Sequence, residues 1–102
     1  PSLTVAALDY PEHLMVIVDN MERESARGEV YITARFSDSL TGWPATEAPA
    51  IIFLLTEKAA QLGSRRAQRK LAKLYKLGAG VEASSEEAHY WRRRAQRNSS
   101  GL

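Results

Sequence analysis

Residues 58–96 read KAAQLGSRRAQRKLAKLYKLGAGVEASSEEAHYWRRRAQ, and this stretch decides the fold. It predicts an amphipathic helix over 63–77, because apolar side chains recur at positions i, i+4, i+7 and i+8 of one helical face. These apolar residues are Ala67, Leu71, Leu74 and Tyr75. At about 100° per residue the opposite face is basic and carries Arg65, Arg66, Arg69, Lys73 and Lys76. Gly78 and Gly80 end the pattern, as glycines do at helix C-termini.

A second helix is predicted from residue 84 to about residue 97. Ser84 and Glu87 have the spacing of a capping box, in which the serine side chain accepts a hydrogen bond from the backbone three residues on. Ala88, Trp91 and Ala95 then form its buried face. The five residues after it, 98–102, are expected to be a frayed tail.

Two further helices are predicted upstream. In the first, Pro11 lies near the start and Leu14, Ile17, Val18 and Met21 keep helical spacing. The second runs from 46 to 62, with Thr46 as its N-cap and Gly63 at its end. Its apolar face consists of Ile52, Leu55, Ala59 and Leu62.

Residues 30–36, VYITARF, fit two patterns. The apolar positions 30, 32, 34 and 36 alternate, and three of the seven residues are β-branched, which favours a strand. The apolar residues at 32, 36, 40 and 43 also keep helical spacing. We interpret the segment as a helix because a repeat of the downstream helix pair needs one there, and we take 42–44 as the turn that follows.

The stretch 58–96 resembles the Sel1-like repeat family, which is tetratricopeptide-like. The matching positions follow one another without a gap. They are Ala59, Ala60, Gly63, Ala67, Gln68, Leu71, Leu74, Tyr75, Gly78, Gly80, Val81, Ala88, Trp91 and Ala95. The chain departs from the pattern at Ala72, where the family commonly has Gly, at Gln96, where it has a second Ala, and at Ser84, near the usual Asp.

Sliding the pattern back by about 35 residues gives a degenerate copy, in which Gly28 matches Gly63 and Ile52 matches Ala88. The resemblance therefore implies an all-α fold: a short right-handed α-solenoid of antiparallel helix pairs with about five helices. We expect a single domain over 1–102. It would comprise an N-terminal cap segment (1–26), a degenerate Sel1-like repeat (27–62), a Sel1-like repeat (63–97) and the tail (98–102).

The sequence contains no pattern that assembles a catalytic site, so we expect the chain not to be an enzyme and to need no cofactor or metal. There is no cysteine, and the only histidines, His13 and His89, lie far apart and lack a metal-ligand spacing. Ser84 and Ser85 are explained by helix capping. The resemblance implies instead a scaffold or adaptor that binds other proteins, a role frequent in bacterial systems.

Charge is unevenly placed along the chain. Residues 1–56 hold three arginines and eight acids, a net charge of −5, and residues 57–102 hold eleven basic residues and four acids, a net charge of +7. We therefore expect the basic helices to bind a protein partner with an acidic surface. The hypothesised partner-binding residues are Arg66, Arg69, Lys73, Lys76, Tyr90, Arg93, Arg94 and Arg97.

Two alternatives stay open. One is a self-associating structural subunit, because two repeats are fewer than a stack usually needs. The other is a nucleic-acid-binding protein that uses the basic face; it is disfavoured because Trp91 should be buried and the net charge is only +2. No membrane span is expected, and the lack of a basic n-region at the N-terminus slightly favours a cytoplasmic location.

Replacement of Trp91 by alanine tests its assignment to the core. We expect the free energy of unfolding, measured by urea denaturation, to fall by about 3–5 kcal/mol because the change leaves a cavity. A near-neutral result would mean that the indole is exposed and free to stack on a base.

Overall fold

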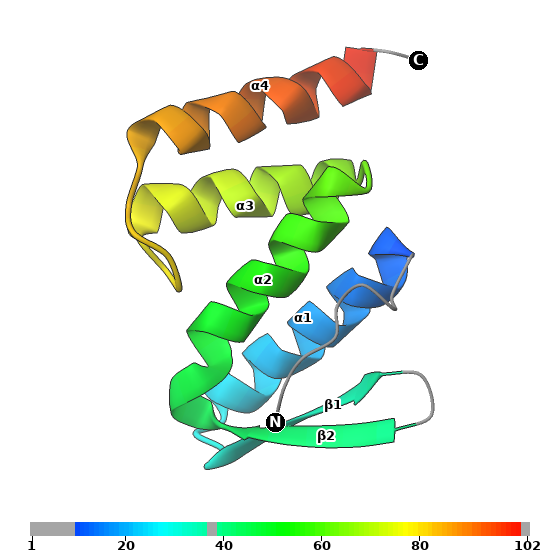
Figure 1. The fold of residues 1–102 in the computed structure, drawn as a ribbon, viewed down its shortest axis with the longest axis vertical. Coiled ribbons are helices and arrows are strands. Elements are labelled where there is room, and N and C mark those ends of the chain that lie inside the picture. The colour runs from blue at the N-terminus through cyan, green and yellow to red at the C-terminus, as the bar shows by residue number, and fades with distance from the viewer. Residues whose placement is uncertain (1–9, 37–38, 101–102) are drawn as a thin grey trace.

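The computed structural model describes residues 10–36 and 39–100. In this part of the chain the protein is mostly helical (Figure 1). Its elements, in order, are α1 (Pro11–Ala26), β1 (Tyr31–Phe36), β2 (Ser39–Pro44), the short 3₁₀ helix η2 (Ala45–Glu47), α2 (Ala48–Gln61), α3 (Arg65–Leu77) and α4 (Ser85–Ser100).

The helices pack in chain order, α1 on α2, α2 on α3 and α3 on α4. The β-hairpin lies at the α1 end of the molecule and α4 lies at the opposite end (Figure 1). One continuous core runs through these layers, and its fully buried side chains include Leu14, Val18, Leu55 and Leu71. Because α4 is the last layer, one of its long sides has no helix of the described chain against it.

The predicted apolar faces of α1, α3 and α4 are confirmed. Leu14, Ile17, Val18 and Met21 of α1 are buried, as are Ala67, Leu71 and Leu74 of α3 and Ala88, Trp91 and Ala95 of α4. Tyr75 is half-buried and packs edge-to-face on Phe53, with ring centroids 5.5 Å apart. Burial raises the pKa of the Tyr75 hydroxyl, because the charged phenolate is poorly solvated there.

The helix ends follow capping chemistry. Ser84 caps α4, since its Oγ accepts a hydrogen bond from the backbone N–H of Glu87 at 3.2 Å, as the capping-box spacing predicts. The reciprocal bond of the box is replaced, because the Ser84 N–H donates to the carbonyl oxygen of Tyr75 at 3.0 Å. Ser64 caps α3 in the same way, with its Oγ accepting from the Ala67 N–H at 3.1 Å.

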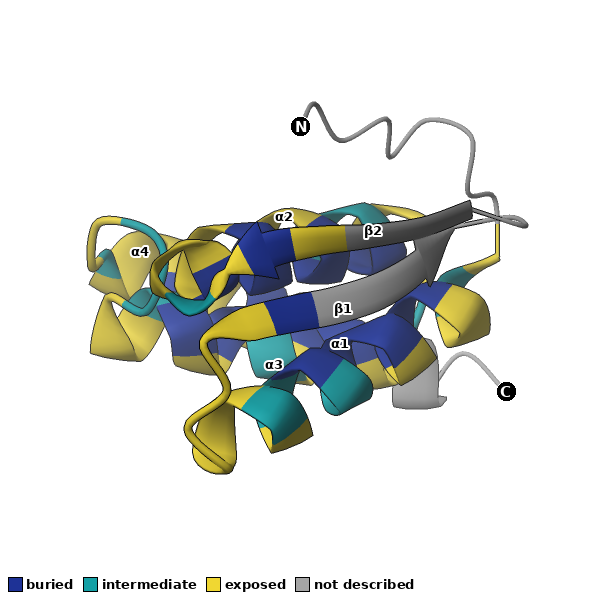
Figure 2. Ribbon diagram, turned by 90° about the horizontal axis from the view of Figure 1, so that it is seen from below, coloured by how far each residue is buried: buried dark blue, intermediate teal, exposed yellow. Residues whose placement is uncertain are grey.

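The interpretation of residues 30–36 as a helix was wrong. Residues 31–36 and 39–44 form an antiparallel hairpin, so 42–44 belong to a strand and not to a turn. The register pairs Ile32 with Trp43, and both are almost completely buried (0% and 2% exposed). A helix would hold these two residues about 16 Å apart along its axis. Pairing them across two strands lets both enter the same core. Figure 2 shows a buried segment, in dark blue, on each strand of the hairpin.

The described part of the chain therefore has four α-helices and a two-stranded sheet, where about five helices were expected. The first half of the degenerate repeat, within 27–62, is a hairpin and not a helix.

Two helix boundaries also differ from the sequence prediction. Helix α2 starts at Ala48 without a side-chain cap, because Thr46 lies in the preceding 3₁₀ turn, and Leu62 beyond its end is 39% exposed. Helix α4 continues through Ser100, so residues 98–100 of the expected frayed tail are helical. Residues 101–102 of that tail and residues 1–9 of the predicted cap segment lie outside the described part of the chain.

Gly80 lies where the α3–α4 loop contacts the backbone at the start of α2. Its φ is +75°, and a Cβ added there would overlap the carbonyl group of Pro49 in the first turn of α2. The loop therefore approaches the backbone of α2 more closely than any side chain allows. Gly63, between α2 and α3, also has a positive φ of +102°, but a Cβ there would meet no atom within 4 Å.

This contrast predicts different costs for two identical substitutions. Gly63→Ala should lose about 1–3 kcal/mol from backbone strain alone, and Gly80→Ala should lose more, because the backbones of the loop and of α2 must also separate. Urea denaturation of both variants measures the difference. Equal losses would show that the close approach at Pro49 contributes nothing to stability.

Candidate functional site

The basic side chains of α3 form two sets, one that contacts α1 and one that lines a groove with α4. On the side toward α1, Arg66 pairs with Asp19 at 2.6 Å and Lys70 pairs with Glu22 at 2.7 Å. The hydrogen bond that Arg66 donates to the Asp19 carboxylate raises the pKa of the Arg66 guanidinium, because it favours the charged form. These two cations therefore attach α3 to α1, and Arg66 already has a partner within the chain.

The other side of α3 forms a groove with α4. The groove has a volume of ≈ 520 Å³, and we call it the α3–α4 groove. Its lining residues are Arg69, Ala72, Lys73, Lys76 and Leu77 of α3 and Arg92 of α4. Among the described residues, none forms an ion pair or a side-chain hydrogen bond with any of these four cations. Leu77 is 66% exposed, so the groove combines unpaired positive charge with an accessible apolar side chain.

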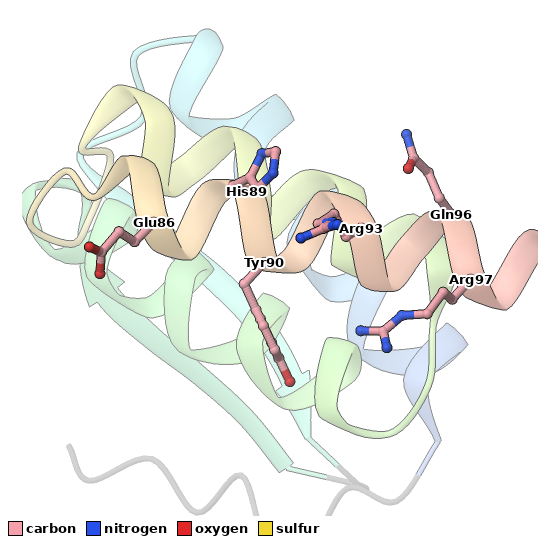
Figure 3. Close-up of a pocket in the computed structure, with 6 residues that line it drawn as sticks. All are labelled: Glu86, His89, Tyr90, Arg93, Gln96 and Arg97. Atoms are coloured by element: carbon pink, nitrogen blue, oxygen red, sulfur yellow. The ribbon is translucent and has the colours of Figure 1, made fainter.

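A second hollow, of ≈ 730 Å³, follows the outer side of α4, and we call it the α4 outer face (Figure 3). All its described lining residues come from α4: Glu86, His89, Tyr90, Arg93, Gln96 and Arg97. A smaller hollow of ≈ 430 Å³ joins the two sites, since it shares His89 with the outer face and Lys76 and Arg92 with the groove. We call this continuous region the basic surface.

Arg94 is held by the aromatic pair beside it. Its guanidinium carbon lies 5.1 Å from the centre of the Trp91 ring, which is the geometry of a cation–π contact. Its Nη1 lies 3.4 Å from the Tyr90 hydroxyl oxygen, at the long end of the hydrogen-bond range. Trp91 itself is only 6% exposed and packs in the core, as predicted, so its ring is not available to stack on a base.

The structure therefore separates the eight predicted site residues into three groups. Arg69, Lys73 and Lys76 line the α3–α4 groove. Tyr90, Arg93 and Arg97 lie on the α4 outer face. Arg66 pairs with Asp19, and Arg94 lies over the Trp91 ring and contacts Tyr90 of the second group.

Sequence reasoning missed Lys70, Leu77 and Arg92. Arg92 follows Ala88 by one helical turn and Trp91 by one residue. The helical spacing therefore predicts its position at the edge of the buried face of α4. Lys70 and Leu77 carried no such signal, because their neighbours depend on where α1 and α4 lie.

The arrangement is suited to binding anionic groups. Guanidinium and ammonium groups around an open groove attract carboxylates or phosphates. In residues 10–36 and 39–100, no three His, Cys, Asp or Glu side chains are grouped so that they could hold a metal ion. No helix in this range is both long and apolar enough to span a bilayer.

Comparison with known proteins found no matching family model, no matching curated protein and no matching solved structure.

A double-mutant cycle measures how strongly Arg66 holds Asp19. The variants Arg66→Ala, Asp19→Ala and the double variant should give a coupling of about 0.2–1 kcal/mol in the free energy of unfolding, because both side chains are solvent-accessible. The coupling should shrink when NaCl is raised from about 0.05 to about 0.5 M, because salt screens the attraction between exposed charges. A coupling of zero at low salt would leave Arg66 available to an external partner.

Proposed function

We propose that this chain is a protein-interaction module that binds an acidic protein surface through the basic surface of α3 and α4. The observation that supports this proposal is the contrast between two sets of cations, those paired with α1 and those lining the α3–α4 groove. Arg66 and Lys70 pair with carboxylates of α1, whereas Arg69, Lys73, Lys76 and Arg92 face no ion-pair partner in the described residues. A partner that supplies carboxylates would complete the second side as α1 completes the first.

The resemblance of residues 58–96 to a Sel1-like repeat supports the same proposal. It would make α3 and α4 the two helices of one repeat, with Gly78 and Gly80 in the loop between them. Repeats of this type act as scaffolds, because their core is closed by neighbouring helices and their outer residues are free to vary. The exposed side of α4 offers such a surface.

Nucleic acid is the less supported ligand. The Trp91 ring is buried, and the rings among the described lining residues of the basic surface are Tyr90, which is 47% exposed, and the imidazole of His89. Binding of single strands usually combines positive charge with several aromatic platforms. The basic surface supplies the charge, but its rings are limited to one tyrosine and one histidine among the described lining residues.

The proposal is tested by affinity capture with the full chain and two charge-reversal variants. Lys73→Glu/Arg93→Glu changes one cation in the groove and one on the outer face. Arg23→Glu/Arg27→Glu makes the same change of net charge at the C-terminal end of α1, in its last turn and at its C-cap. We expect a nuclease-resistant protein partner to be retained by the original chain and by the α1 variant, and lost by the variant of the basic surface.

Three results would contradict the proposal. Retained material that nuclease removes would indicate a nucleic-acid-binding protein. Equal capture by both variants would place the binding site elsewhere. Light scattering that shows the chain itself as the retained partner would indicate a self-associating subunit.

A further inference from the structure

Helix α1 packs on α2, and two of its carboxylates reach across to cations of α3, which shows how acidic residues of one helix can meet the cations of α3. Asp19 and Glu22 lie three residues apart on α1, and Arg66 and Lys70 lie four residues apart on α3. Residues at these spacings lie on one face of their helix. A guanidinium nitrogen of Arg66 lies 2.6 Å from a carboxylate oxygen of Asp19, and the Lys70 ammonium lies 2.7–2.8 Å from both carboxylate oxygens of Glu22. The match is one of spacing as well as charge, since both helices present ions one turn apart.

The α4 side of α3 repeats the cationic half of this pattern. Arg69 and Lys73 are again four residues apart, and Lys76 follows at the next turn. The three positions span about 10 Å along the helix axis, at about 1.5 Å per residue. Arg92 reaches the same groove from α4. In the described residues no carboxylate pairs with any of these cations.

The groove also carries an apolar component that a purely electrostatic ligand would not use. Leu77 is 66% exposed, and Ala72 contributes to the lining between the cations. Exposed apolar surface bordered by polar groups is typical of contacts with proteins. A phosphate backbone has charge at regular intervals but offers no apolar group to cover Leu77.

We infer that the α3–α4 groove binds an amphipathic acidic helix of a partner protein. Carboxylates one turn apart on that helix meet Arg69, Lys73 and Lys76, and an apolar residue on the adjacent stripe covers Leu77. Arg92 closes the groove from the α4 side. This inference rests on the proposed function and names the kind of element that the groove accepts.

Two synthetic peptides test the inference. Each is about 16 residues long, which is about four turns of α-helix. The first has Glu at i, i+4 and i+7 with Leu on the neighbouring stripe. The second has the same composition in an order that scatters Glu and Leu around the helix. We expect fluorescence anisotropy with the full chain to show binding of the first peptide at least about tenfold tighter than that of the second, because only the first aligns several ion pairs and an apolar contact.

Matched variants of the protein locate the binding site. Lys73→Glu in the groove and Arg93→Glu on the α4 outer face make the same change of charge on exposed residues. We expect Lys73→Glu to weaken binding of the first peptide by about tenfold or more, and Arg93→Glu to have a much smaller effect. Leu77→Gln should reduce the preference for the first peptide over the second. Circular dichroism of each variant checks that it is folded.

Several outcomes would overturn the inference. Equal binding of the two peptides would mean that charge alone is recognised, and binding of neither would mean that no helix of this pattern docks. A larger loss with Arg93→Glu than with Lys73→Glu would move the site to the outer face and leave the proposed function standing. Tighter binding of a single-stranded RNA of equal charge would contradict both proposals.

Discussion

The burial of the narrow apolar side of α3 between α2 and α4 is the constraint on which the rest of the structure depends. Leu71 and Ala67 are fully buried, and the buried side chain of Gln68 donates a hydrogen bond to the carbonyl oxygen of Ala60 at 3.0 Å. This bond satisfies a polar group that would otherwise be costly in the core. Because these contacts orient α3, they also determine where its remaining charged residues point.

The electrostatics of the molecule follow from that orientation. The first half of the chain is acidic and the second half is basic, and Arg66 and Lys70 of α3 form ion pairs with carboxylates of α1. Arg69, Lys73 and Lys76 form none of these ion pairs and line a groove with Arg92. The proposed binding of an acidic protein surface would use these cations.

The surface proposed to bind a partner is positioned by contacts that lie behind it. Trp91 fills the α3–α4 interface and holds Arg94 over its ring, while Ser84 fixes the start of α4. Gly80 brings the intervening loop against the first turn of α2. A partner would then bind helices that are already ordered in the free protein, and this lowers the entropic cost of binding.

Local periodicity by itself determined the helices α1, α3 and α4, their buried faces and the Ser84 cap, because a helix brings residues three and four apart onto one side whatever surrounds it. Residues 30–44 were different, since their apolar residues suited both a helix and a strand. Only the tertiary structure decided for the hairpin, by giving Ile32 and Trp43 a shared buried position.

The tertiary structure likewise decided that Arg66 pairs with Asp19 while Lys73 lines the groove. The helical spacing made both residues exposed and basic, and it carried no information about which neighbour each would face. Contacts between residues far apart in the chain depend on how whole helices pack, and that packing is a property of the assembled core.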